Sequence, residues 1–257
     1  MVSLYNFNCQ QLENLKAEDV IVPELLQILN AEDLSYEKLV PIIKEEAREV
    51  YSFPFLKPEF CALLTEEIES YEKEKKEGSL PNGLNREGWV LQEVGINLDL
   101  VLLPYINKLI DHLLSPKLQV DSNHSYIIRY RADGFKSLKF HTDDSDVTFN
   151  LCLKFEGKGN ELVFGGHFSE RPGTPTMEEA ASSKGYGEYT HTVGRALLHS
   201  GWVYHAVKPL LEGVRWNFIL WGMKHDEEWK RTFYEELKQS LREKSKKTFD
   251  SMKVGDQ

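Results

Sequence analysis

The stretch Ser137-Leu-Lys-Phe-His141-Thr-Asp143-Asp-Ser-Asp146 decides how the rest of the chain is interpreted. Side chains alternate between the two faces of an extended strand, so residues two positions apart point the same way. An imidazole and a carboxylate at positions 141 and 143 therefore converge on one point. They supply two of the three ligands of a facial 2-His-1-carboxylate metal site. His-x-Asp alone is common and more often consists of two solvated surface residues, so the interpretation requires a third ligand.

The third ligand must come from a distant strand, and the candidates downstream are His199 and His205. We favour His205 because it lies in the apolar, strand-like run from Trp202 to Val207. Ten residues after it comes Arg215, which opens another apolar run that ends at Trp221. The complete pattern is a His-x-Asp, a distant His and an Arg ten positions beyond that His.

This pattern resembles the 2-oxoglutarate- and Fe(II)-dependent dioxygenases, most of all their prolyl and lysyl hydroxylase branch. Lysyl hydroxylases carry a similar His-x-x-Gly-x-x-x-x-Gly-x-Arg ending, and Lys208 stands here where that ending has its first glycine. They also have a His upstream of the metal ligand that matches His199. We therefore interpret His199 as a neighbour that orients the site.

The resemblance implies that His141, Asp143 and His205 bind Fe(II) and that Arg215 binds the far carboxylate of 2-oxoglutarate. It further implies O₂ as a cosubstrate, ascorbate as an optional cofactor, and hydroxylation of a prolyl or lysyl side chain in a protein or peptide, with succinate and CO₂ as co-products. Two alternatives are an oxidative demethylase of a histone or nucleic acid and a non-catalytic cupin-like binding module. The intact set argues against the binding module, and a metal-only hydrolase would not need Arg215.

Alternation also indicates which polar side chains share the face of the ligands. Over residues 147–155, Thr148, Asn150 and Cys152 lie on one face and apolar side chains on the other. A buried polar face is costly unless it lines a wet or liganded cavity. Some relatives have a Tyr at the position of Cys152 that contacts the far carboxylate. Because this chain departs there, the second partner of that carboxylate is open, with Thr148 and Asn150 as candidates.

Near the end of the pattern, Asn217 shares the face of Arg215. A guanidinium inside an apolar barrel needs an anion, because an unpaired buried charge is heavily penalised. A ligand carboxylate is the expected partner, since its pairing with Arg is bidentate and geometrically selective. Relatives also place a Tyr that reaches the cosubstrate at the position of Tyr130, although Tyr130 is equally compatible with a core aromatic.

The fold class follows from a change of hydrophobic period at His124. Residues 1–120 predict a mainly helical support region, with helices at Ser35–Glu49 and Leu98–Leu114, the second on the outer face of a sheet. Residues 121–225 predict a double-stranded β-helix, the jelly-roll form of cupins. A charged helix is expected over residues 226–257, and the whole is an α+β, mainly β chain, expected to form one structural domain. The expected strands are His124–Arg131, Ser137–Thr142, Val147–Phe155, Asn160–Phe168, Tyr189–Thr192, Arg195–His199, Val203–Val207 and Val214–Met223.

Two segments are predicted to be loops. Residues 169–187 are rich in Gly and Pro, and we expect a mobile surface loop at the cavity mouth. Residues 78–85 are interpreted as an ordinary connector in preference to a cover over the site. His167 lies at a strand end, where a solvated His is favoured over a substrate contact.

Composition limits the classes of partner. The net charge of −10 argues against general electrostatic binding of nucleic acid. Cys9, Cys61 and Cys152 are widely spaced, which predicts free thiols in a reducing compartment. No secretory signal is visible, and the longest apolar runs are too short to span a bilayer. We therefore expect a cytoplasmic or nuclear protein, whose oligomeric state the sequence does not indicate.

Overall fold

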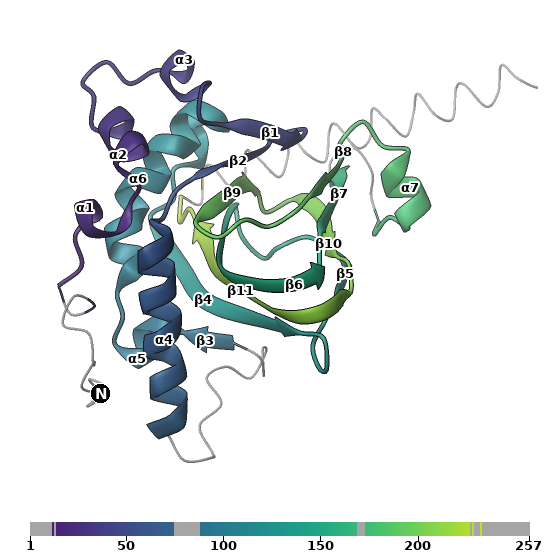
Figure 1. Ribbon diagram of the computed structural model, residues 1–257. Helices are drawn as coiled ribbons and strands as arrows, with labels where there is room; N and C mark the ends of the chain where they lie inside the picture. Colours follow the sequence, from purple (N-terminus) through teal and green to yellow (C-terminus); the bar gives the residue numbers. More distant parts are fainter. Residues whose placement is uncertain are drawn as a thin grey trace, which may run out of the picture.

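The computed structural model describes residues 12, 14–74, 88–168, 173–226, 228 and 232. The predicted loop over residues 78–85 and nearly all of the predicted C-terminal helix lie outside this set. No helix in the described part is both long and apolar enough to cross a membrane. The helices are α1 (Ala17–Val20), α2 (Pro23–Leu29), α3 (Tyr36–Leu39), α4 (Pro58–Glu74), α5 (Leu91–Val94), α6 (Leu98–Leu113) and α7 (Met177–Ala181), with a short 3-10 turn at Pro116–Leu118 (Figure 1).

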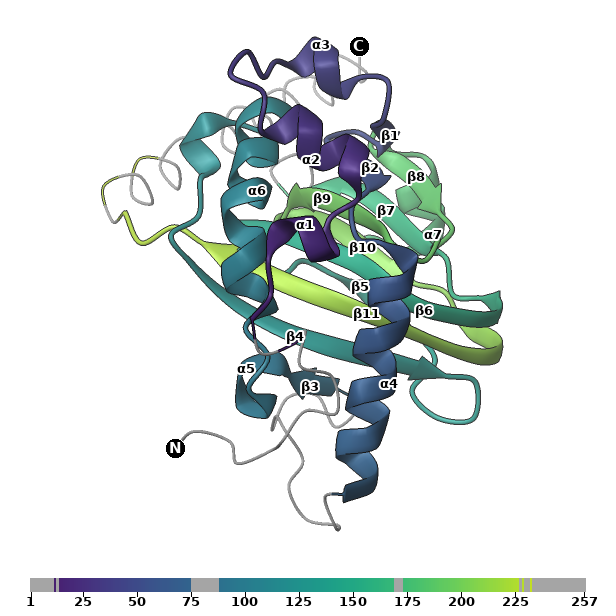
Figure 2. The same ribbon diagram turned by 60° about the vertical axis from the view of Figure 1, so that its left-hand side comes forward.

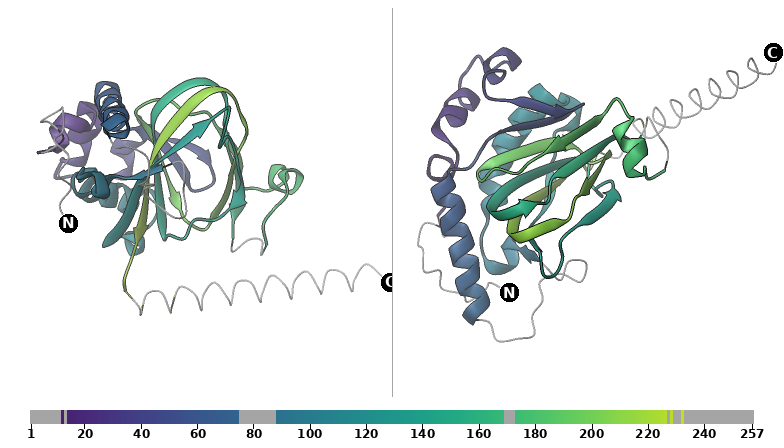
Figure 3. Two further views of the ribbon diagram at one scale, coloured as in Figure 1. Left: turned by 90° about the horizontal axis from the view of Figure 1, so that it is seen from below. Right: turned by 45° about the vertical axis from the view of Figure 1, so that its right-hand side comes forward.

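Two antiparallel sheets curve around a shared interior (Figure 3, left). The larger sheet has the order β1-β2-β9-β6-β11-β4-β3, and the smaller has the order β5-β10-β7-β8. From β4 onward the chain passes from one sheet to the other at every connection except that between β7 and β8. This topology is a double-stranded β-helix and confirms the predicted fold class. The strands are β1 (Lys44–Ala47), β2 (Val50–Pro54), β3 (Gly88–Val90), β4 (Ser122–Arg131), β5 (Leu138–His141), β6 (Val147–Gly159), β7 (Leu162–His167), β8 (Tyr186–Tyr189), β9 (Arg195–Ser200), β10 (Val203–Val207) and β11 (Leu210–Met223).

Seven of the eight predicted barrel strands coincide with observed strands, and the fifth is wrong. It was expected at Tyr189–Thr192, whereas β8 ends at Tyr189. Gly187 lies inside β8, and a glycine is required there because a Cβ would stand 2.3 Å from the main-chain oxygen of Glu46 in β1. The glycine permits the close approach of two strands, but in the sequence it was interpreted as a loop residue.

The N-terminal region is not helical throughout, and the helix predicted over Ser35–Glu49 is wrong beyond Leu39. Lys44–Ala47 in the remainder form β1, and β2 follows it and pairs with β9 from Val50, opposite His199, to Pro54. The Glu-, Lys- and Ala-rich composition favours a helix locally, but strand pairing and burial override that weak preference. The N-terminal region therefore extends the barrel's own larger sheet at both edges, through β1 and β2 on one side and β3 on the other.

Helices α4 and α6 lie against the outer face of the larger sheet (Figure 2). Phe149 and Phe218 from that sheet share one buried apolar cluster with Leu64 of α4 and Ile106 of α6. Burial of this apolar surface is the main force that holds the layers together. The predicted helix over Leu98–Leu114 and its packing on the outer face are confirmed.

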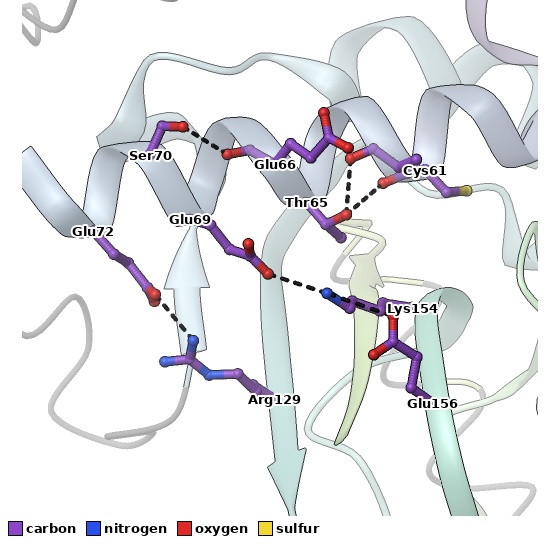
Figure 4. A network of polar contacts seen from close by, with 10 residues as sticks. Cys61, Thr65, Glu66, Glu69, Ser70, Glu72, Arg129, Lys154 and Glu156 are labelled. Atoms are coloured by element: carbon purple, nitrogen blue, oxygen red, sulfur yellow. Dashed lines mark hydrogen bonds and ion pairs between the residues drawn. The ribbon is translucent and has the colours of Figure 1, made fainter. Parts of the chain in front are cut away.

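Ion pairs add to this packing along α4 (Figure 4). Glu69 pairs with Lys154 of β6 at 3.2 Å, and Glu72 pairs with Arg129 of β4 at 3.0 Å. Because these side chains remain partly exposed, each pair contributes less than about 1 kcal/mol to the free energy of unfolding.

The described part of the predicted 169–187 loop has more structure than expected. Thr176 and Glu179 form a complete capping box at the start of α7. Pro175 and Ala180 pack against Gly165 of β7, so the segment contributes no side chain to the metal cavity described below. Its predicted place at the cavity mouth and its mobility both stay predictions.

Candidate metal centre

Two histidines and one aspartate converge inside the barrel. His141 ends β5, His205 lies in the middle of β10, and the two residues are cross-strand partners. Asp143 follows two residues after His141, and its main-chain N–H donates to the oxygen of Gly201 at 2.9 Å. Potential ligand atoms of the three side chains all lie within 4.8 Å of one another. The structure thus brings His205 to the His-x-Asp pair.

Both imidazoles direct the same nitrogen, Nε2, toward the point where the three side chains converge. The Nδ1 atoms of His141 and His205 lie 2.8 and 3.0 Å from the main-chain oxygens of Lys139 and Val203, which can only accept. Each Nδ1 therefore carries the proton, and each Nε2 keeps its lone pair, as a metal ligand requires. Both Nε2 atoms lie 3.6 Å from the carboxylate of Asp143. Burial, and then the neighbouring His205, lower the pKa of His141 and favour its neutral form.

Thr148 belongs to the metal end of the cavity. Its hydroxyl donates to Asp143 Oδ2 at 2.6 Å and lies 3.0 Å from the hydroxyl of Ser145. This bond fixes the carboxylate that faces both imidazoles. Thr148 was predicted as a candidate partner of the far carboxylate, but the structure places it beside Asp143.

His199 lies beside the cluster. Its ring is fully buried and packs edge-on against His205, with 5.2 Å between the centroids. Its Nδ1 donates to the main-chain oxygen of Ser200 at 2.8 Å. Burial first, and then His205, lower the pKa of His199 to about 4, so the ring is neutral near pH 7. Its contact with His205 is compatible with the predicted orienting role.

Arg215 lies deeper in the same cavity, and its side chain is 1% exposed. Its Nη1 donates to the main-chain oxygen of Asn160 at 2.7 Å, and its guanidinium lies over the ring of Tyr130, 4.4 Å from the centroid. Its buried Nε has no hydrogen-bond partner in the described part of the chain. No carboxylate among the described residues forms an ion pair with it.

The pairing of β6 with β11 gives the order of these groups along the cavity. Thr148 lies opposite Trp221, and Asn150 lies opposite Ile219. Arg215 is closer to the turn that precedes β11. The cavity lining contains the triad, Arg215, and the predicted residues Tyr130, Thr148, Asn150 and Asn217, together with Tyr126, Ile128, Leu138, Leu162, Val207, Ile219 and Trp221.

Asn150 and Asn217 belong to a small buried polar row. Asn217 Nδ2 donates to Asn150 Oδ1 at 2.6 Å and lies 3.2 Å from Nδ1 of His191. Cys152 pairs with Asn217 across the ladder, but it does not line the cavity, and burial raises the pKa of its thiol to about 12. The sequence analysis did not identify His191 and Asn160 as site residues. It placed both in predicted strands, whereas both lie in connections between strands, where alternation does not indicate the inward face.

Comparisons with known proteins can be set beside this geometry. A family model described as the OGFOD2-like domain matches residues 1–119. The 2-oxoglutarate and iron-dependent oxygenase domain-containing protein ICU11 of Arabidopsis thaliana is 33% identical over 186 residues, which cover 67% of this chain and 44% of that protein. This chain resembles the 2-oxoglutarate- and iron-dependent oxygenases. It spans about half the length of the curated oxygenases it matches.

Two hydroxylases are more distant from it. A procollagen lysyl hydroxylase and glycosyltransferase of Acanthamoeba polyphaga mimivirus is 26% identical over 210 residues, which cover 77% of this chain and 21% of that protein. The crystal structure of a Pseudomonas putida prolyl-4-hydroxylase covers 79% of this chain and 96% of its own, with 14% identity and a TM-score of 0.45.

The residues present fit the two groups on which such oxygenases depend. His141, Asp143 and His205 offer two imidazole nitrogens and a carboxylate around one point, the donor set of a non-haem Fe(II) site. The unpartnered Nε of Arg215 offers a buried cationic donor for a carboxylate in the same cavity.

Proposed function

We propose that this chain is an Fe(II)- and 2-oxoglutarate-dependent oxygenase that hydroxylates a prolyl or lysyl side chain of a protein or peptide, with succinate and CO₂ as co-products. His141, Asp143 and His205 hold the metal, and Arg215 holds the far carboxylate of 2-oxoglutarate. The observation that carries the proposal is the guanidinium of Arg215, buried in the cavity of the triad without a carboxylate partner among the described residues.

This observation separates the proposal from its rivals. A buried unpaired charge is strongly destabilising, so a site that keeps one requires an anionic ligand. A hydrolase that used only the metal would have no need of that anion. A non-catalytic barrel could bind the anion but would have no need of three metal ligands.

The chain's own residues hold and shield the reactants. Iron and 2-oxoglutarate, when bound, supply the oxidising chemistry with O₂. Thr148 keeps the carboxylate of Asp143 oriented, and the main-chain oxygens of Lys139 and Val203 keep both imidazoles in the ligand tautomer. Apolar side chains, including Leu138 and Val207, limit the access of water to the cavity.

A protein or peptide is the favoured class of substrate. The net charge of −10 gives no support to a general affinity for nucleic acid, and the lysyl hydroxylase likeness favours a peptidyl side chain. Cys61 and Cys152 are free and buried, which supports a reducing compartment such as the cytoplasm or nucleus.

The proposal is tested by titrating the full chain with Fe(II) under anaerobic conditions, with and without 2-oxoglutarate. We expect a weak visible charge-transfer band that requires both reagents, because only a 2-oxo acid chelated to ferrous iron produces it. His205→Ala should give no band. A protein that binds iron stoichiometrically but shows no band with excess 2-oxoglutarate would contradict the proposal. Succinate formed after O₂ is admitted then reports turnover, and mass spectrometry of candidate peptides reports hydroxylation.

A further inference from the structure

We propose that Asn160 is a positioning residue that sets the orientation of Arg215 and so determines how strongly the site prefers a 2-oxo acid with a far carboxylate. The inference rests on the proposed function and deepens it. Asn160 is 1% exposed and lies in the connection between β6 and β7, where the sequence analysis predicted the start of a strand. Its left-handed backbone, with φ of +67°, is compatible with a turn and not with a strand.

Asn160 ties three connections together at the end of the barrel where Arg215 lies. Its amide Nδ2 donates to the main-chain oxygen of Lys136, between β4 and β5, at 2.9 Å. The same atom donates at 2.8 Å to the main-chain oxygen of Lys208, between β10 and β11. Its own main-chain N–H donates to the oxygen of Pro209 at 3.2 Å. Residues far apart in sequence are therefore held by one buried side chain.

The same residue accepts the hydrogen bond that orients the guanidinium. The main-chain oxygen of Asn160 receives Arg215 Nη1 at 2.7 Å, and the ring of Tyr130 lies against the guanidinium plane. These two contacts fix one corner and the plane of the guanidinium. Nε of Arg215 has no hydrogen-bond partner among the described residues. A carboxylate that binds at Nε depends on the position of the oxygen of Asn160, because that oxygen orients the guanidinium.

The side chain at this position has few substitutes. Asp has the shape of Asn but would place an oxygen against the carbonyl oxygens of Lys136 and Lys208, where a donor is required. Gly adopts the left-handed backbone without strain, but it lacks the amide that donates to Lys136 and Lys208, so the turn is no longer held to those two connections. Asn160→Gly is therefore the informative variant, because it removes the clamp and leaves the backbone conformation accessible.

The test compares two 2-oxo acids on the full chain loaded with Fe(II) under anaerobic conditions. 2-Oxoglutarate and pyruvate share the group that chelates the metal, but only 2-oxoglutarate has a far carboxylate. In Asn160→Gly we expect the Kd of 2-oxoglutarate, measured by the charge-transfer band, to rise about tenfold, the effect of a weakened hydrogen bond to a charged group. The Kd of pyruvate and the Kd of Fe(II) should change less than about twofold.

Asn107→Ala is the matched control. The side-chain amide of Asn107 in α6 also holds main chain in place. Its Nδ2 donates to the main-chain oxygen of Val120, and its Oδ1 accepts from the main-chain N–H of Val120, both at 2.9 Å. It lies outside the cavity lining, so its loss should lower the melting temperature without changing the Kd of either acid.

Three results would overturn the inference about Asn160. The first is an unchanged Kd for 2-oxoglutarate in Asn160→Gly, and the second is an equal rise in the Kd of both acids. The third is failure of both Asn160→Gly and Asn160→Asp to fold, which would show that the side chain of Asn160 serves stability alone. A wild-type protein that binds Fe(II) but gives no band with 2-oxoglutarate contradicts instead the proposed function on which the inference rests.

Discussion

Arg129 and Arg215 lie on adjacent strands of the larger sheet but in opposite environments. Arg129 lies over the ring of Trp216, its cross-strand partner, and Arg215 lies over the ring of Tyr130, its own cross-strand partner. Arg129 faces outward and pairs with Glu72 of α4 (Figure 4). Arg215 faces inward and has no carboxylate partner in the described part of the chain.

The difference between the two arginines separates a structural charge from a functional one. The outer charge is neutralised within the chain and remains partly hydrated, so it contributes little to stability in either direction. The inner charge is dehydrated, and its compensation is left to a ligand. Its cost is tolerated because the same cavity holds the histidine and aspartate cluster, where an anionic cosubstrate would bind.

The largest expected effect comes from removing a metal ligand on the inner side. His205→Ala, like His141→Ala and Asp143→Ala, should abolish turnover and reduce the bound iron to background, because two donors cannot hold Fe(II) against water. His199→Ala should retain iron, because its ring contacts His205 and lies outside the triad. Metal content measured on each purified variant decides between them. Loss of iron from His199→Ala with retention in His205→Ala would reassign the triad.

The next effect separates the two arginines directly. Arg215→Lys keeps the charge but loses the planar fork, so the KM for 2-oxoglutarate should rise about ten- to a hundredfold, with iron affinity hardly changed. Arg129→Lys is the matched control and should leave that KM unchanged. If Arg215→Lys lowered the melting temperature but kept the wild-type KM, Arg215 would have a structural role, and the proposed difference between the two arginines would be contradicted.

A pH effect is expected from His191, which lies in the inner polar row. Burial first, and then Arg215, lower its pKa well below 6.5, so the folded protein keeps this imidazole neutral. Below pH 6.5 the unfolded chain takes up a proton that the folded chain refuses. The stability is therefore complete above pH 6.5 and is lost as the pH falls, by up to about 1.4 kcal/mol per pH unit for one proton. Denaturant unfolding between pH 7 and pH 5 should show a shallower slope for His191→Gln, and equal slopes would contradict this assignment.

The smallest effect belongs to the outer ion pair. Glu72→Gln should lower the free energy of unfolding by less than about 1 kcal/mol, because Glu72 and Arg129 are partly exposed. The affinity for 2-oxoglutarate should be unchanged. Urea denaturation and the charge-transfer titration on one preparation check both expectations. A clear loss of 2-oxoglutarate affinity would show that the outer face is coupled to the cavity.

The periodic parts of the structure were open to prediction from sequence. Alternation in an extended chain places His141 and Asp143 on one face, and it places Arg215 and Asn217 together on another strand. Seven barrel strands followed from the same period. In contrast, the residues of β1 were predicted as helix, because their composition favours helix and their pairing with β2 is not encoded in a local period.

Strand alternation thus predicted from residue order that Thr148, Asn150, Arg215 and Asn217 face inward, because that property repeats every two residues and requires no knowledge of distant parts. Cys152, on the same predicted face, does not line the cavity. How the inward side chains divide the cavity depended on the tertiary structure. It assigned Thr148 to Asp143, left the Nε of Arg215 without a partner among the described residues, and placed the turn residue Asn160 against Arg215. The contact between Asn160 and Arg215 joins residues 55 positions apart, and the bond from Thr148 to Asp143 depends on how the connection before β6 folds back, so no strand period encodes either contact.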